Sequence, residues 1–257
     1  MVSKQVTKIV QNLEKKKFRE KYNLFKTEGE KLVGELLRSP FGINTIIALP
    51  EWLERHSGLP AGAMIYEATE REMQAVSNFP SPPSVIALAE MPAYPCDFDT
   101  LTRGITLALN GIQDPGNLGT ILRVADWFGI RDLLCDTDCA SPYNPKCVQA
   151  SMGAIFRVRA HSVPLPDAIR RLRDAGMPVY GTFLDGENIY TASLPAHGII
   201  VMGNEGKGIA PGIEALTDHR LTIPAFVGEG PAGESLNVGV ATGIVLSEFK
   251  RRIYLTH

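Results

Sequence analysis

The chain has 257 residues, of which 44% are hydrophobic and 21% charged, and its formal net charge is −2. This composition is typical of an ordinary globular protein with one large domain or two modest ones. No apolar run approaches the roughly 20 residues that span a bilayer, and the N-terminal stretch alternates apolar and charged residues, which excludes a secretory signal. We therefore expect a cytoplasmic protein with no membrane partner.

Residues 3–38 are predicted to be helical, and residues 1–38 carry a local excess of positive charge. Val6, Ile9, Val10 and Leu13 recur at the spacing of one helix face. Residues 1–38 contain ten lysines and arginines against five acidic residues, a local charge of +5 on an otherwise acidic chain. Two interpretations fit this excess: a solvated helix face, or an electrostatic footprint for a phosphate backbone.

The chain then alternates short strands with a helix. Strands are predicted at 43–49 and 84–90, with a helix around 70–76 between them. This alternation indicates a small α/β domain of three or four strands. The proline-rich segment 90–100 is typical of a linker. We therefore predict a first domain, a linker and a second domain at 1–90, 91–102 and 103–257.

The second domain shows a longer alternation of the same kind. Strands are predicted at 104–112, 131–136, 155–160, 178–183, 198–203 and 219–224. Helices are predicted between or after them at 117–128, 145–152, 166–175, 208–216 and 235–252. The pattern predicts an α/β fold with a mostly parallel sheet and helices on both faces. Ligands of such sheets bind beyond the carboxyl ends of the strands, so the loops there are candidate sites.

The first of these loops leads into the helix at 117–128. Asp114 is suited to cap that helix and Pro115 to its first turn. At about 100° per residue, Arg123 and Trp127 lie opposite the apolar stripe formed by Leu118, Ile121, Leu122 and Ala125. An exposed arginine is ordinary, whereas an exposed tryptophan beside it is less common. The pair suggests that another surface or a ligand covers this face.

The second loop is glycine-rich, and the third precedes an apolar helix. Residues 203–208, GNEGKG, match neither the dinucleotide pattern GxGxxG nor the phosphate loop GxxxxGK[ST]. The three glycines of this loop would let the backbone approach a ligand closely, and a plain strand–turn–helix connection is the alternative. After the third loop, Ser235 is suited to cap the final helix. That helix is apolar or small on nearly every side through Leu246, which predicts burial all round.

The four cysteines match no common zinc or redox spacing. Reduced structural thiols are the expected state of Cys96, Cys135, Cys139 and Cys147. A metal site using Cys135, Cys139 and His161 is the alternative. We predict no metal.

Taken in order, the three loops resemble the motifs of a known family. They are NGIQDPGNLGTILRVADWFG, then IIVMGNEGKGI, then TIP followed by SLNVGVATGIVLSE. This set is similar to the SpoU/TrmH-type branch of the SPOUT RNA ribose 2′-O-methyltransferases. The resemblance covers roughly residues 103–252, including the connecting region 141–158. The N-terminal domain resembles the L30e-like substrate-binding module, most closely at 25–37.

The resemblance implies a fold, a methyl donor and a set of site residues. The fold would be a trefoil-knotted C-terminal domain that acts as a homodimer, with Arg123 near the partner's site. S-adenosylmethionine would be held mostly by backbone, at the positions Thr182, Gly203, Glu205, Gly206, Ile223 and Leu236. The catalytic and RNA-contacting positions carried over are Asn117, Arg123, Glu205, Ser235 and Asn237. One departure is the long loop at 225–234, which adds Glu229 and Glu234 near the expected site.

The expected reaction is in-line attack of a ribose 2′-hydroxyl on the methyl group of a sulfonium. No histidine lies in the motifs, and arginine stays protonated in proteins. Arg123 is therefore predicted to grip a phosphate bidentately and to stabilise alkoxide charge, rather than to act as a base. Asn117, Ser235 and Asn237 would orient the ribose. Glu205 is the runner-up as proton acceptor.

Ribosomal RNA is the predicted substrate, favoured over transfer RNA by analogy and by the basic N-terminal region. A tRNA 2′-O-methyltransferase and a non-catalytic RNA-binding relative are the alternatives. Asn117, Arg123, Glu205 and Asn237 are all present, which argues against a decayed site. A nicotinamide oxidoreductase is the alternative from another class, and the missing GxGxxG argues against it.

Overall fold

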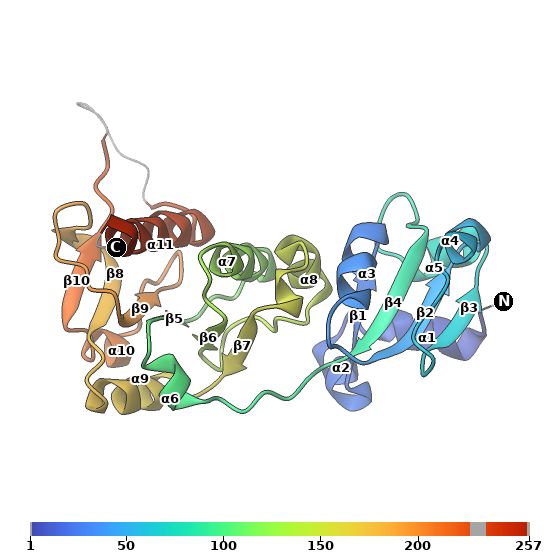
Figure 1. Ribbon diagram of the computed structural model, residues 1–257, viewed down its shortest axis with the longest axis horizontal. Coiled ribbons are helices and arrows are strands. Elements are labelled where there is room, and N and C mark those ends of the chain that lie inside the picture. Colours follow the sequence, from blue (N-terminus) through green and yellow to red (C-terminus); the bar gives the residue numbers. More distant parts are fainter. Residues whose placement is uncertain (1, 227–234, 256–257) are drawn as a thin grey trace. The chain divides into compact units, whose positions relative to one another are not determined.

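The computed structural model describes residues 2–226 and 235–255, and the chain forms two compact units (Figure 1). The first unit contains Met1–Ala93 together with Ser141–Arg157. The second contains Tyr94–Ala140 together with Val158–His257. Within the described residues, no helix combines the length and the apolar character needed to cross a membrane.

The first unit is a four-stranded sheet with helices on both faces. Its strands lie in the order β1 (Leu24–Glu28), β4 (Val85–Glu90), β2 (Ile43–Ala48) and β3 (Met64–Glu67). Alternate residues of β2 and β4 enter two separate cores, because side chains of a strand alternate between its faces. Helices α3 (Glu30–Leu37) and α4 (Pro50–Arg55) cover one face, and α1 (Lys4–Asn12) and α5 (Glu70–Val76) cover the other.

The prediction that residues 3–38 are entirely helical is wrong, because β1 lies within them. All five residues of β1 are buried, including Lys26 and Glu28. The Lys26 ammonium pairs with Glu14 at 2.9 Å and with Glu28 at 2.6 Å, and it donates to the carbonyl of Val76 at 3.3 Å. Buried charges are tolerated when they are paired in this way. The strand therefore carries two charged side chains that conceal its buried character in the sequence.

The segment Ser141–Arg157 packs within the first unit, although it follows β6 in the chain. It contains α8 (Pro145–Ser151) and a 3-10 turn at Ala154–Phe156. Phe156 packs edge-on against Phe41 with ring centroids 5.4 Å apart. The predicted strand at 155–160 is therefore wrong in its first half. Gly153 has a φ of +93°, which turns the backbone into the 3-10 turn, and the strand begins only at Arg159.

The second unit is a six-stranded sheet in which every recorded strand pair is parallel. The strand order is β10 (His219–Thr222), β8 (Val179–Asn188), β9 (Gly198–Met202), β5 (Ile105–Leu109), β6 (Asp132–Cys135) and β7 (Arg159–Ser162). The predicted fold, an α/β domain with a mostly parallel sheet after a small α/β domain, is confirmed. The trefoil knot stays a prediction.

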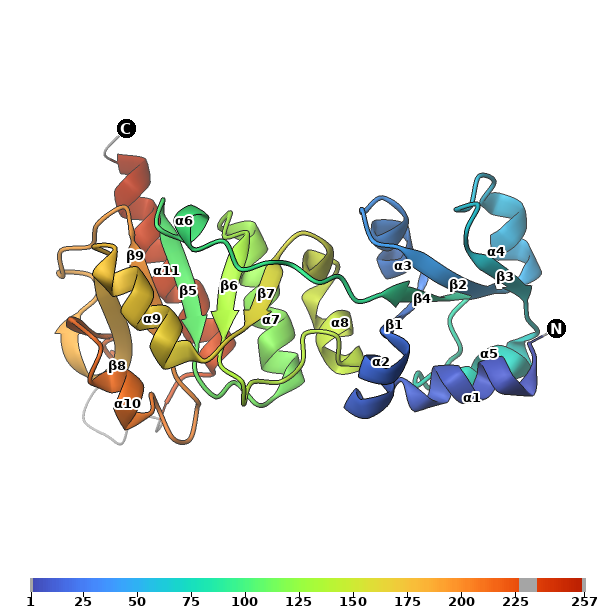
Figure 2. The same ribbon diagram turned by 90° about the horizontal axis from the view of Figure 1, so that it is seen from below.

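Helices cover both faces of this second sheet (Figures 1 and 2). On one face lie α6 (Phe98–Leu101), α9 (Leu165–Asp174) and α10 (Pro211–Glu214), which share a core with Ala108, Leu134, Ile199 and Val201. On the other face α7 (Pro115–Trp127) lies against α11 (Val238–Leu255). Helix α10 is shorter than the predicted 208–216, because Gly208 has a φ of +69° and pairs with Asn204 in a closed turn.

The C-terminal part of α11 is anchored by a buried carboxylate. Glu248 is 6% exposed and accepts hydrogen bonds from Arg251 at 2.8 Å and from Arg252 at 2.7 Å. Arg252 also donates to the carbonyl of Tyr190, beyond β8, at 2.7 Å. The hydrogen bond from Arg251, and then that from Arg252, lowers the pKa of Glu248 to about 2. The stability that this shift contributes is present above the ordinary glutamate pKa and is lost as the pH falls toward 2.

We expect Glu248→Gln to lower the free energy of unfolding by about 1 kcal/mol at pH 7, since its arginine partners are partly exposed and solvent screens the pairs. The difference from the wild type should shrink at pH 3, where the unfolded carboxylate is protonated. Urea unfolding at both pH values measures it. An equal difference at pH 7 and pH 3 would contradict a role for the charge of Glu248.

Candidate functional site

Three segments meet where parallel strands of the second unit end: the start of α7, the loop after β9 and the start of α11. Asn237 joins them through its side-chain amide. Its Nδ2 donates to Asn117 Oδ1 at 2.9 Å and to Glu205 Oε1 at 2.7 Å. Three of the five residues predicted to act in catalysis are therefore directly hydrogen-bonded, although Asn117 and Asn237 are 120 positions apart.

The orientation of the Asn237 amide is set by the helix that follows it. Its Oδ1 accepts from the backbone N–H of Gly239 at 3.0 Å and of Val240 at 3.3 Å. These are the donors at the start of α11 that have no partner within the helix. With Oδ1 used by the cap, Nδ2 is left to face Asn117 and Glu205. The predicted cap at Ser235 is therefore wrong: the helix begins at Val238, and Asn237 caps it.

Glu205 is held on the same helix start. Its Oε1 accepts from Asn237 and from the backbone N–H of Val238 at 2.9 Å. A carboxylate is favoured there, because the first amide groups of a helix carry partial positive charge. Within the described part of the chain, Glu205 Oε2 has no recorded hydrogen-bond partner. The residue is exposed and its second oxygen is available to a ligand.

The loop after β9 is a closed turn built by Asn204. Its backbone pairs with Gly208 in both directions, at 3.0 and 2.8 Å. Its Oδ1 accepts from Gly206 N–H at 2.9 Å and from Lys207 N–H at 3.0 Å, and its Nδ2 donates to the carbonyl of Gly111 at 2.7 Å. The side chain thus ties the loop that carries Glu205 to the segment that leads into α7.

Glycine is required at position 203 by the turn itself. A Cβ on Gly203 would lie 2.5 Å from the carbonyl carbon of Gly208 and 2.6 Å from the nitrogen of Ile209. No side chain is accommodated at such distances from backbone. From the sequence, the glycines of this loop are expected to admit close approach of a ligand, whereas at Gly203 the close neighbour is the chain's own backbone.

Two asparagines that position this site were not singled out from the sequence. Asn204 is one, and Asn110 is the other. Asn110 is buried, donates to Asp136 Oδ2 at 3.0 Å, and accepts from the backbone N–H of Ala210 at 2.7 Å. An asparagine one or two positions after a buried strand is the signal that marks both, because its amide can pair with backbone groups of neighbouring loops.

Arg123 and Trp127 lie as predicted, on the outer side of α7. The stripe of Leu118, Ile121, Leu122 and Ala125 is fully buried, while Arg123 is exposed and Trp127 is 85% exposed. No hydrogen bond or ion pair of Arg123 is recorded among the described residues. The structure therefore does not join Arg123 to the cluster of Asn117, Glu205 and Asn237 within one chain.

The remaining predicted positions come from β8, from the segment after β10 and from the residues before α11. Thr182 donates to the carbonyl of Val201 on β9 at 3.0 Å. Ile223 follows β10 and is half-buried, while Leu236 precedes Asn237 and is 47% exposed. Ser235 is exposed as well. Glu229 and Glu234, which the sequence predicts near the site, belong to residues 227–234, which lie outside the described residues.

None of the four cysteines, all of which lie among the described residues, forms a disulfide. Cys139 donates to the carbonyl of Leu109 and accepts from the N–H of Ile112, both at 3.3 Å, and a hydrogen bond from Cys135 lowers the pKa of Cys139. His161 Nε2 lies 2.7 Å from Asp132 Oδ1. Across residues 2–226 and 235–255, no group of three or more potential metal ligands is found.

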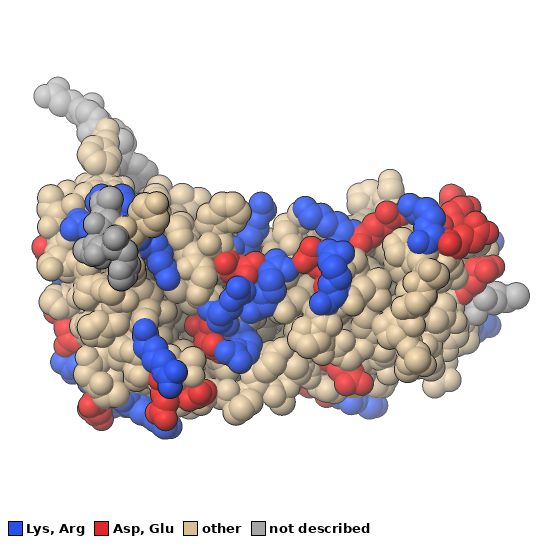
Figure 3. Space-filling model, viewed as in Figure 1, with Lys and Arg blue, Asp and Glu red and all other residues tan. Residues whose placement is uncertain are grey.

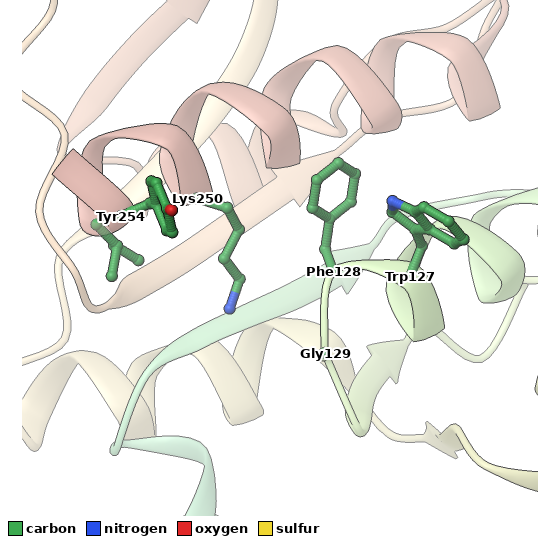
Figure 4. A pocket seen from close by; sticks show the side chains of 6 residues that line it. Trp127, Phe128, Gly129, Lys250 and Tyr254 are labelled. Carbon is green, nitrogen blue, oxygen red and sulfur yellow. The ribbon is translucent and has the colours of Figure 1, made fainter. Parts of the chain in front are cut away.

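An exposed apolar surface extends along α7 and α11. Trp127 and Phe128 project side by side from the end of α7, and Lys250 and Tyr254 come from α11 (Figure 4). Tyr254 is 84% exposed and Val240 is 52% exposed. The prediction that α11 is buried all round therefore fails within a single chain. Burial lowers the pKa of Lys250.

Two family models match the chain, one in each half. The SpoU rRNA Methylase family matches residues 104–247. The MRM3-like substrate binding domain matches residues 4–87.

Among similar proteins, the 23S rRNA (guanosine(2553)-2′-O)-methyltransferase RlmP of Bacillus subtilis is 33% identical over 235 residues, which cover 91% of each chain. A putative RNA methyltransferase of the TrmH family from Porphyromonas gingivalis superposes with a TM-score of 0.87 at 41% identity, covering 98% of this chain and 99% of that one. An AdoMet-bound rRNA methyltransferase from Sinorhizobium meliloti superposes with a TM-score of 0.85 at 28% identity, covering 98% of this chain and 97% of that one.

Proposed function

This chain belongs to the SpoU rRNA methylase family, and from that premise we propose that it transfers the methyl group of S-adenosylmethionine to a ribose 2′-hydroxyl of ribosomal RNA. It is an RNA 2′-O-ribose methyltransferase. The observation that carries the proposal is the hydrogen-bonded cluster of Asn117, Glu205 and Asn237 beside the glycine-rich turn. A non-catalytic protein that only binds RNA would not need to hold these polar side chains together at an exposed site.

The residues around the turn fit the methyl donor. Bound S-adenosylmethionine supplies a methyl group on a sulfonium, which is a good leaving group. We assign its adenosine to the apolar side chains of Ile223 and Leu236 and to the backbone near Gly203 and Gly206. Leu236 is 47% exposed, as expected of an apolar side chain that a ligand covers. Thr182 would line the same region from β8.

The polar cluster would orient the ribose and handle the proton. Asn117 and Asn237 are fixed by their mutual hydrogen bond, so their other hydrogen-bonding groups face the substrate in one geometry. As the methyl group forms its bond to the 2′-oxygen, the carbon–sulfur bond breaks and the hydroxyl proton leaves. Glu205 Oε2 is our assigned acceptor for that proton. Ser235, exposed beside Leu236, would contact the ribose or its phosphate.

Arg123 is assigned to the RNA rather than to proton transfer. A guanidinium stays protonated, and it binds phosphate oxygens bidentately. Its exposure and its lack of recorded partners among the described residues leave all its donors to a ligand. We propose that Arg123 grips the neighbouring phosphate and stabilises charge that develops on the 2′-oxygen.

We further propose that the enzyme is a homodimer whose subunits meet over α7 and α11. The exposed side chains of Trp127, Val240 and Tyr254 lie along these two helices, and a monomer rarely exposes such large apolar groups together. A second copy would cover them. It would also bring its Arg123 to the Asn117–Glu205–Asn237 cluster of the first, which supplies the group that a single chain does not place there.

Within this proposal, residues 1–90 form the RNA-binding module, 91–102 the linker and 103–257 the methyltransferase domain with its trefoil knot. Ribosomal RNA is favoured over transfer RNA because RlmP of Bacillus subtilis is a 23S rRNA enzyme by its name. A cytoplasmic location belongs to the same proposal. Mapping 2′-O-methyl marks in total RNA with and without the gene identifies the target; loss of a mark from tRNA alone would overturn the choice of ribosomal RNA.

Calorimetric titration tests the donor site directly. The wild type should bind S-adenosylmethionine and not NAD. Gly203→Ala should weaken this binding tenfold or more, because its Cβ forces the turn open against Gly208. Gly212→Ala is the matched control, since a Cβ there meets no atom within 4 Å, and it should bind like the wild type. Binding of NAD alone would overturn the proposed function.

A further inference from the structure

Helix α2 (Lys16–Tyr22) presents a lysine-rich surface that the methyltransferase site does not use. Lys15, Lys16, Lys17 and Lys21 are all exposed. The acidic residue among them is Glu20, whose carboxylate lies 3.8 Å from the Lys16 ammonium. We call these four lysines, with the rings of Phe18 and Tyr22, the α2 lysine surface. Its exposed side chains carry a net charge of +3.

Two of these lysines are held in place by aromatic rings. Phe18 and Tyr22 are four positions apart, so they lie on one face of the helix, with ring centroids 6.2 Å apart and planes 13° from parallel. The Lys17 ammonium lies 5.1 Å from the Phe18 centroid, and the Lys21 ammonium lies 5.6 Å from the Tyr22 centroid. Cation–π attraction restricts both side chains, so less entropy is lost when they bind a ligand.

The buried side of α2 keeps this surface rigid and positive. Arg19 is 2% exposed and donates to the carbonyls of Leu13 at 2.8 Å and Glu14 at 2.9 Å, which fastens α2 to the end of α1. The Glu14 carboxylate is paired with the buried Lys26 at 2.9 Å. The Glu14 carboxylate, on the N-terminal side of α2, is thus occupied by Lys26 rather than by the exposed lysines.

Much of the positive charge of the first unit lies in the segment that contains this helix. Residues 1–38 carry +5, whereas 39–93 contain two arginines against six glutamates, a net charge of −4, and 141–157 add Lys146 and Arg157. On the face of the molecule drawn in Figure 3, basic and acidic side chains are interspersed. A local excess on a protein of overall charge −2 indicates an acidic partner that binds at one place.

We propose that the α2 lysine surface binds phosphates of the substrate RNA strand. This inference rests on the proposed function. Ammonium groups spaced along an exposed helix suit successive phosphates, and flat rings beside them suit unstacked bases of single-stranded segments. An anionic membrane is a poorer fit, because an interfacial helix needs a broad apolar face turned outward, and Phe18 and Tyr22 are half-buried.

The test compares two double variants that remove the same charge. Lys17→Gln with Lys21→Gln removes the two ring-held lysines, and Lys4→Gln with Lys8→Gln removes two exposed lysines of α1. The probe is an unmodified 23S rRNA transcript in filter-binding assays at several salt concentrations. We expect the α2 double variant to bind at least tenfold more weakly at 0.1 M salt. The slope of log K against log salt should become shallower by about 1.4, the value for the loss of two single-strand phosphate contacts.

The α1 control should bind within threefold of the wild type, and both variants should keep wild-type affinity for S-adenosylmethionine. Equal RNA affinity of the α2 variant and the α1 control would overturn the proposal that the α2 lysine surface binds RNA. Failure of the wild type to methylate any RNA while the α2 variant still loses RNA binding would overturn the proposed function and leave the surface supported.

Discussion

Asn237→Ser is expected to lower kcat for RNA methylation by about 10²-fold with little change in stability. Serine caps a helix about as well as asparagine, so the start of α11 should be preserved. It has no amide to donate to Asn117 and Glu205, which Asn237 contacts at 2.9 and 2.7 Å. Loss of positioned donors at a reacting centre typically costs two to three powers of ten. Single-turnover kinetics and thermal unfolding measure the two effects separately.

Asn237→Ala is the companion variant, because it removes both the cap and the donors. It should lose about the same activity as Asn237→Ser and in addition about 1 kcal/mol of stability. The affinity for S-adenosylmethionine should change much less than kcat in the serine variant. A serine variant with near-normal kcat would show that the hydrogen bonds to Asn117 and Glu205 serve the fold alone.

Arg123→Lys is expected to lower kcat/KM by about 10³-fold, although the positive charge is retained. Lysine is a point charge and cannot form the two parallel hydrogen bonds of a guanidinium with a phosphate. Arg123 is exposed and packs against no core, so the stability of the variant should stay within about 0.5 kcal/mol of the wild type. Near-normal turnover of Arg123→Lys would refute a bidentate grip.

Mixing two inactive variants decides whether Arg123 acts across the dimer. Subunits of Arg123→Ala and Asn237→Ser, unfolded and refolded together in equal amounts, should form heterodimers as half of all dimers. If Arg123 serves the partner's site, one of the two sites in each heterodimer is intact, so about a quarter of wild-type activity should return. If Arg123 acts within its own chain, every site keeps a defect and the mixture stays inactive.

The candidate site was readable from the sequence because its residues lie in three compact motifs. Asn117, Glu205 and Asn237 were assigned because these motifs resemble those of the SpoU/TrmH-type family. Their mutual hydrogen bonds were not readable, since 120 positions separate Asn117 from Asn237. The sequence also assigned the helix cap to Ser235, because serine and asparagine are equally good caps and only the backbone decides which one precedes the first helical residue.

The elements that periodicity missed are those whose burial depends on distant partners. β1 escaped notice because Lys26 and Glu28 look like solvent-exposed residues until Glu14 is seen to pair with the lysine. Residues 155 and 156 were read as strand because isoleucine and phenylalanine favour strands. They form a 3-10 turn instead, since Gly153 has a positive φ and Phe156 packs on Phe41.

The sequence by itself determined the α/β class, the parallel direction of the strands and the outward direction of Arg123 and Trp127. These follow from local periodicity, because a 3.6-residue repeat assigns each side chain to a helix face whatever lies beyond it. Only the tertiary structure decided which loops meet, which oxygen of Glu205 is occupied and where Ser141–Arg157 packs. Those outcomes depend on contacts between residues far apart in the chain, and no local pattern encodes such contacts.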